Sequence, residues 1–123
     1  MLHIKSTHAN FSVNDIGAAK QFYVDTLGFT VKRETADDLM LESSAGTFVH
    51  LYHKADHQPW NATVFGIQVD DVAVAVAELS AKGVQIAKLE GTDSAGIMHD
   101  PNLGDAAWFT DPAGNWLCVD NLD

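Results

Sequence analysis

The sequence predicts an α+β fold in which one βαβββ unit occurs twice, and three observations lead to this prediction. Asp15 starts a helical pattern that ends near Gly28, and Asp71 starts another that ends near Gly83. A glycine followed by a strand-like segment also recurs, at Gly46 and Gly114. The offset between copies grows from 71 − 15 = 56 to 114 − 46 = 68 residues, which indicates a longer loop in the second copy.

The first copy begins with a strand at residues 7–13, where Ala9, Phe11 and Val13 alternate with polar residues. Asp15 can cap the next helix, because its carboxylate accepts from the free backbone N–H groups at a helix start. That helix carries an apolar stripe at helical spacing: Ile16, Ala19, Phe22, Tyr23 and Leu27. Three strands are expected after it, at residues 29–34, 39–42 and 47–53, with polar turns between them.

The second copy repeats this order. A strand is expected at residues 63–69, a helix from Val72 to Gly83, and strands at residues 84–89, 106–110 and 116–119. Residues 91–104 are expected to form a long loop, and loops of that length in compact domains are often binding loops. We therefore expect one domain, with module 1 at about residues 5–54, a linker at about 55–61 and module 2 at about 62–123.

Composition bounds the protein class. The 123 residues carry a formal charge of −10, from 7 basic and 17 acidic side chains, so phosphate backbones would be repelled and nucleic acid is not an expected partner. A cationic small molecule would be attracted, although such a charge also serves solubility. We expect neither a secretory leader nor a membrane span. Cys118 is the only cysteine, which excludes an internal disulfide framework and favours a cytoplasmic location.

The outer strands of each copy separate two kinds of side chain. One face is apolar and suits burial under the helices. The other face mixes polar and aromatic groups: His8, Asn10, Ser12, Phe48, His50, Tyr52, Val64, Gly66, Gln68, Trp116, Cys118 and Asp120. This mixture suits a ligand cleft and also a solvated sheet face. The curl of a four-stranded sheet and the burial that large aromatic side chains favour lead us to expect a cleft.

Two sequence elements resemble those of the vicinal oxygen chelate superfamily, which includes glyoxalase I, bleomycin-resistance proteins, fosfomycin-resistance enzymes and extradiol dioxygenases. They are the Phe-Tyr and Leu-Gly-Phe steps at residues 22–23 and 27–29, and Phe-Thr-Asp-Pro-Ala-Gly-Asn at residues 109–115. The resemblance covers nearly the whole chain. It implies two βαβββ modules that form a curled mixed sheet around a cleft, commonly completed by a homodimer. These elements are structural and do not choose among the family's functions.

The resemblance also implies where a metal would bind, namely at four strand positions that hold His8, Val64, His50 and Cys118 here. Val64 cannot donate to a metal, and Cys118 stands where the family usually has Glu. Neither the oxygen ligands that Mg²⁺ prefers nor the two His and one carboxylate of Fe²⁺ dioxygenases are present. We expect no metal cofactor as first choice; the alternative is a divalent metal, held in a softer, zinc-like site by His8, His50 and Cys118.

Two functions follow as hypotheses. The first is a binding protein of the bleomycin-resistance type that holds a small organic molecule, aromatic or cationic, without changing it. The expected ligand-binding residues are His8, Asn10, Phe48, His50, Tyr52, Gln68, Trp116 and Cys118. The second is a metal-dependent lyase, isomerase or dioxygenase of the glyoxalase type that uses His8 and His50, with no catalytic base assigned. A metal-free lyase or isomerase with either histidine as base lies between them.

Overall fold

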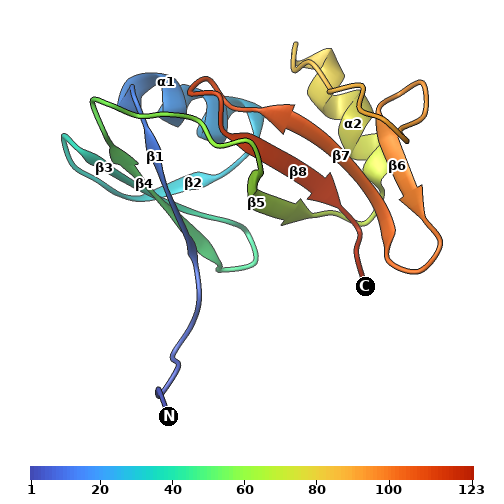
Figure 1. The fold of residues 1–123 in the computed structure, drawn as a ribbon. Helices are drawn as coiled ribbons and strands as arrows, with labels where there is room; N and C mark the ends of the chain where they lie inside the picture. The colour runs from blue at the N-terminus through green and yellow to red at the C-terminus, as the bar shows by residue number, and fades with distance from the viewer. The chain divides into compact units, whose positions relative to one another are not determined.

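The computed structural model describes all residues from Met1 to Asp123. The chain divides into two compact units, Met1–Gln58 and Pro59–Asp123. Each unit has its own four-stranded sheet with a helix on one face (Figure 1). No helix has the length and apolarity that crossing a bilayer requires.

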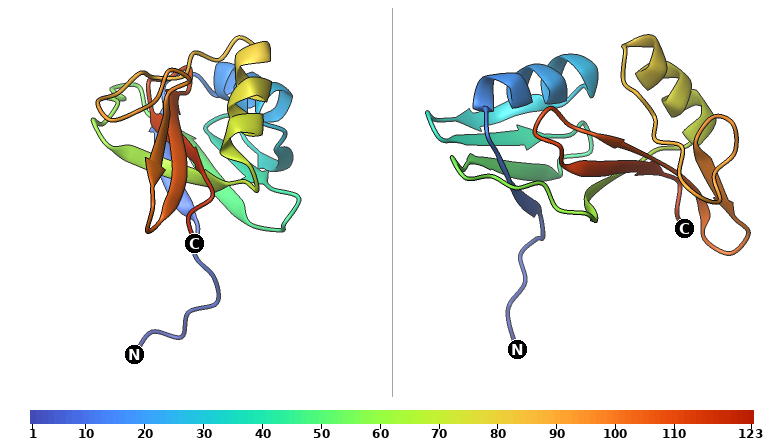
Figure 2. Two further views of the ribbon diagram at one scale, coloured as in Figure 1. Left: turned by 90° about the vertical axis from the view of Figure 1, so that its right-hand side faces the viewer. Right: turned by 45° about the horizontal axis from the view of Figure 1, so that its top comes forward.

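The first unit has the predicted βαβββ order. Its elements are β1 (Ala9–Val13), α1 (Ile16–Gln21), the π-helical turn η1 (Phe22–Thr26), β2 (Thr30–Glu34), β3 (Asp38–Glu42) and β4 (Phe48–His53). The strands lie in the order β1-β4-β3-β2, with β1 parallel to β4 and the other pairs antiparallel. Helix α1 contacts β3 and β4 on one face, as the right-hand view of Figure 2 shows.

The second unit repeats this topology. Its elements are β5 (Thr63–Gln68), α2 (Val72–Ala81), β6 (Ile97–Asp100), β7 (Gly104–Thr110) and β8 (Trp116–Asp120). The order is β5-β8-β7-β6. The first and last strands of the unit, β5 and β8, again pair in parallel, and the other pairs are antiparallel. The predicted α+β fold with two βαβββ modules is therefore confirmed.

Both helices begin and end as their sequences predict. Asp15 Oδ1 accepts from the Ala18 N–H at 3.0 Å, and Asp71 Oδ1 accepts from the Val74 N–H at 3.1 Å. After each helix a glycine takes a φ of +87°, a conformation that a side chain disfavours. These two glycines are Gly28 and Gly83. The same start and stop signals thus shape both copies.

The face of each sheet that its helix covers forms the core. In the first unit the side chains of Tyr23, Leu39 and Leu51 have no exposed surface. In the second unit Phe109 and Leu117 are equally buried, with 1% and 0% exposed. The residues proposed for ligand binding alternate with these core residues along the strands, so they lie on the face away from the helix.

One part of the second unit differs from the prediction. Residues 84–89 are not a strand, and the expected loop at 91–104 instead contains β6. β2 begins 30 − 28 = 2 residues after Gly28, whereas β6 begins 97 − 83 = 14 residues after Gly83. The difference of 12 residues equals the growth in offset from 56 to 68, so the extra length of the second copy lies between Gly83 and β6. β6 takes the edge of β7, while residues 84–89 make a single backbone hydrogen bond to it, from Ala87 N–H to the Trp108 carbonyl at 2.9 Å.

Candidate functional site

The open face of the first sheet holds His50 between two hydrogen-bond partners. His50 lies on β4, in register with Asn10 on β1. Its Nδ1 lies 2.8 Å from Asn10 Oδ1, and its Nε2 lies 2.8 Å from Asp38 Oδ1 on β3. Hydrogen bonds from His50 and then Thr35 lower the pKa of Asp38 below its ordinary value. Both ring nitrogens are engaged, so the imidazole is held in place between β1 and β3.

Aromatic rings lie on the same face. His8 stacks on Phe48, with ring centroids 4.3 Å apart and planes at 25°. The Lys32 ammonium lies 4.9 Å from the Phe48 ring centroid, a cation–π contact. The Tyr52 ring lies 5.8 Å from that of His50 and is 37% exposed. The structure therefore gathers five of the predicted ligand-binding residues on one surface of the first unit: His8, Asn10, Phe48, His50 and Tyr52.

The open face of the second sheet holds Cys118, next to Gly66 on β5 and Trp108 on β7. The register therefore places Trp108 on the face away from the helix, where its Nε1 donates to Thr63 Oγ1 at 3.1 Å. The thiol of Cys118 donates to Asp120 Oδ2 at 3.5 Å. Burial, followed by the neighbouring Asp120, raises the pKa of Cys118 to about 12. Cys118 is consequently a protonated thiol at neutral pH and a poor nucleophile.

This protonation state predicts slow alkylation. At pH 8 the folded chain is expected to react with iodoacetamide at least about tenfold more slowly than the urea-unfolded chain, because only the thiolate attacks. Electrospray mass spectrometry of timed samples measures the rate. Asp120→Asn removes the nearby negative charge and should speed the reaction in the folded state. Equal rates in folded and unfolded chains would contradict the assignment.

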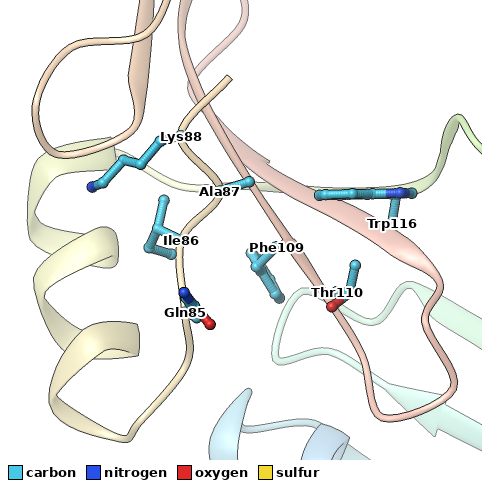
Figure 3. Close-up of a pocket in the computed structure, with 7 residues that line it drawn as sticks. All are labelled: Gln85, Ile86, Ala87, Lys88, Phe109, Thr110 and Trp116. Atoms are coloured by element: carbon cyan, nitrogen blue, oxygen red, sulfur yellow. The ribbon is translucent and has the colours of Figure 1, made fainter. Parts of the chain in front are cut away.

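Gln68 and Trp116 lie on the same open face, two residues along their strands from Gly66 and Cys118. Gln68, at the end of β5, donates from Nε2 to the Leu122 carbonyl at 2.6 Å and so fixes the C-terminal segment. Trp116, at the start of β8, lines a cavity of about 380 Å³ (Figure 3). The other residues around that cavity are Gln85, Ile86, Ala87, Lys88, Phe109 and Thr110. Sequence reasoning missed all six, four of them because the alternation at residues 84–89 reads as an ordinary strand.

A second histidine with two partners lies on β6. His99 Nε2 is 2.8 Å from Asp93 Oδ2, and its Nδ1 is 2.8 Å from Asp105 Oδ1. These bonds raise the pKa of His99 above 6.5, and the bond from His99 lowers the pKa of Asp93 below 3.8. His99 therefore joins β6 to β7 and to the preceding turn, whereas the sequence placed it in a loop.

The pH dependence of this contact follows from the two shifts. The stabilisation from His99 is present below pH 6.5 and is lost as the pH rises through its raised pKa. The stabilisation from Asp93 is present above pH 3.8 and is lost as the pH falls through its lowered pKa. Amide hydrogen exchange in β6 should therefore be slowest between these values, after correction for intrinsic rates. In His99→Gln, the loss of protection as the pH rises above 6.5 should disappear. An unchanged dependence of β6 exchange on pH in that variant would contradict the assignment.

A protein-family model covers nearly the whole chain. The model of the Glyoxalase/Bleomycin resistance protein/Dioxygenase superfamily matches residues 5–119. The chain belongs to this superfamily. The sequence-based resemblance to glyoxalases, bleomycin-resistance proteins and dioxygenases is thereby confirmed. No curated protein sequence matches the chain.

Solved structures with the same fold include proteins described as binding proteins and as enzymes. TnmS3, an antibiotic binding protein from a Streptomyces species, is 25% identical, with a TM-score of 0.72 and 100% of both chains covered. A superfamily member from Sphaerobacter thermophilus is 25% identical, with a TM-score of 0.75 and coverage of 97% and 98%. A lactoylglutathione lyase from Agrobacterium tumefaciens is 15% identical, with a TM-score of 0.74 and coverage of 97% and 95%, which shows a common fold alone.

None of the residues at the four family metal positions supplies a carboxylate oxygen. Val64 has no donor atom, and the other three positions offer only nitrogen and sulfur. His8 is stacked on Phe48. Within either unit, no three His, Cys, Asp or Glu side chains converge as a ligand set. The superfamily's metal chemistry therefore has no matching donor set among these residues.

Proposed function

We propose that this superfamily member binds a small aromatic organic molecule on the open face of its first sheet, without a metal and without bond making or breaking. The observation that carries this proposal is His50, held by Asn10 and Asp38 beside exposed aromatic rings. A fixed polar group next to aromatic surface gives orientation and contact area, as binding sites require.

One solved relative and part of the superfamily description support binding. TnmS3 is described as an antibiotic binding protein, and it aligns over the full length of both chains. Bleomycin-resistance proteins give the superfamily part of its name. For an enzyme of the glyoxalase type, the positions of Val64 and Cys118 lack both a ligand and a carboxylate base.

The charge of the chain favours an aromatic cation. The formal charge is −10, and the Asp38 side chain, 45% exposed, lies in register with Tyr52 on the open face. An aromatic cation can place its ring on Tyr52 and its charge near Asp38. The Lys32 ammonium lies over the Phe48 ring in a cation–π contact, so one ring on this surface already holds a cation.

Proflavine, a planar aromatic cation, tests the proposal by fluorescence anisotropy. We expect saturable binding that weakens with added salt, because the attraction is partly electrostatic. Tyr52→Ala should weaken binding about fivefold, while the matched control Tyr52→Phe keeps the ring and the affinity. Absence of binding, or equal affinity in both variants and the parent chain, would overturn the proposal for this surface.

Metal analysis tests the other half of the proposal. Protein purified without chelator and dialysed into metal-free buffer should hold far less than one Fe, Ni, Zn or Mn per chain, because the donor set is incomplete. Inductively coupled plasma mass spectrometry gives the stoichiometry. About one metal per chain, lost in His8→Ala or His50→Ala, would instead support the metal-dependent alternative.

A further inference from the structure

The outer edge of β7 is only partly covered. β6 pairs with it over residues 104–107, and the Ala87 N–H reaches the next residue, bonding the Trp108 carbonyl at 2.9 Å. Beyond Trp108 no strand continues the ladder on that side. The 380 Å³ cavity lies at this point, between β7 and residues 85–88, and has the volume of a small-ligand pocket.

The backbone of Thr110 points to this open edge. Asp111 N–H donates to the Asn115 carbonyl at 3.0 Å, so the backbone groups of Asp111 face β8. Adjacent residues of an antiparallel strand direct their backbone groups to opposite sides, so those of Thr110 face residues 85–88. No backbone hydrogen bond joins Thr110 to that segment. The backbone N–H and C=O of Thr110 therefore face the cavity together, one as a donor and the other as an acceptor.

The remaining lining combines apolar side chains with the polar Gln85 and Lys88. Figure 3 shows the Trp116 indole extending toward Ala87, with Thr110 beside it. Phe109 and Ile86 close the inner side and are themselves buried, with 1% and 7% exposed. A flat ring placed against the indole would contact apolar atoms on several sides.

Residues 85–88 are fixed by two contacts. A Cβ at Gly96 would lie 2.6 Å from Ile86 Cγ2 and 2.8 Å from the Ala87 carbonyl oxygen, so the two backbones approach closely there. The Ala87 N–H is also bonded to the Trp108 carbonyl of β7. These contacts hold one wall of the cavity in place, which lowers the ordering cost of binding a ligand.

We propose that this cavity is a second binding site, one that takes an uncharged planar aromatic molecule with a lactam or carboxamide edge. The ring lies against Trp116, and the amide exchanges two hydrogen bonds with the Thr110 backbone, as an added strand would. The site lies within the second unit and depends on none of the residues of the first-sheet surface proposed above.

Isoquinolin-1(2H)-one is the probe, because it joins a flat bicyclic ring to one lactam edge. In 1H–15N correlation spectra of the full chain, the Thr110 amide and the Trp116 indole N–H should shift together, with a dissociation constant on the order of a millimolar. The matched compound 2-methylisoquinolin-1-one lacks the N–H and should bind about tenfold more weakly. Equal affinity of the two compounds would overturn the role of the Thr110 edge.

Side-chain variants separate stacking from folding effects. Trp116→Leu should weaken probe binding about tenfold, and Trp116→Phe should retain most of it. Trp60→Phe, at a tryptophan that is 67% exposed and outside the cavity, is the control and should leave binding unchanged. Thermal unfolding checks that each variant is folded. Equal binding by folded Trp116→Leu and the parent chain would overturn the proposal.

Proflavine, measured in parallel, distinguishes this inference from the proposed function. If proflavine binds and neither Thr110 nor Trp116 shifts with isoquinolinone up to about 10 mM, roughly tenfold above the expected constant, only the present inference fails. If isoquinolinone binds at the cavity and proflavine does not bind, the present inference stands and the first-sheet proposal fails. Absence of binding by both compounds would overturn both.

Discussion

Gly96→Ala is expected to lower the free energy of unfolding by about 2–5 kcal/mol, the sum of a left-handed backbone and an overpacked contact. Gly96 has a φ of +88°, which a side chain disfavours. An added Cβ would also meet Ile86 Cγ2 at 2.6 Å, and Ile86 is buried. Either the segment before β6 shifts or the core around Ile86 opens. Urea unfolding followed by circular dichroism gives the loss.

Gly83→Ala provides the matched control. Gly83 has a φ of +87° in the same unit, and no atom lies within 4 Å of its added Cβ. It should therefore carry only the backbone cost of about 1–2 kcal/mol. The difference between the two variants isolates the contact with Ile86. If both variants lose the same stability, close packing at Gly96 does not hold residues 85–88 in place.

Asp111→Ala is expected to cost about 2–4 kcal/mol, because it leaves buried donors without a partner. Asp111 is 5% exposed and Asn115 is 2% exposed. Asp111 Oδ1 accepts from the N–H groups of Ala113 and Asn115 at 2.9 Å, and its Oδ2 accepts from Asn115 Nδ2 at 3.1 Å. These bonds fix the turn between β7 and β8. Thermal unfolding by calorimetry measures the loss.

Asp111→Asn tests the same turn more gently. The Asn side chain keeps an oxygen for the N–H groups of Ala113 and Asn115, and it places a second amide nitrogen against Asn115 Nδ2. The expected loss is smaller than that of the alanine variant, since only one of the three bonds becomes unfavourable. A loss in Asp111→Asn as large as in Asp111→Ala would contradict the role given to the two backbone bonds.

Local signals made most of the fold predictable. Asp15 and Asp71 cap their helices, Gly28 and Gly83 end them, and alternation along the outer strands identified the buried faces. Each of these features depends on residues close in the sequence, where steric and hydrogen-bonding preferences act directly. The sequence-based prediction of two βαβββ units is confirmed on this basis.

The second-unit edge and the partners of His50 were not predictable in this way. Residues 84–89 alternate like a strand, but β6 takes the β7 edge, because strand pairing depends on a distant partner and its register. Asp38, which the sequence placed in a polar turn, begins β3 and bonds His50. The assignment of the ligand-binding residues remains a prediction, and so does the absence of a metal cofactor.

The connection between α2 and β6 is longer than the one that precedes β2. The second unit can therefore accept more sequence change at this point than the first unit. Residues 85–88 form one wall of the Trp116 cavity, and a single backbone bond connects residues 84–89 to β7. Exposed positions there, such as Gln85 and Lys88, can vary without altering the pairing of β5, β8 and β7. Randomising these positions would diversify ligand selectivity on a constant scaffold, an option that the three-residue connection before β2 does not offer.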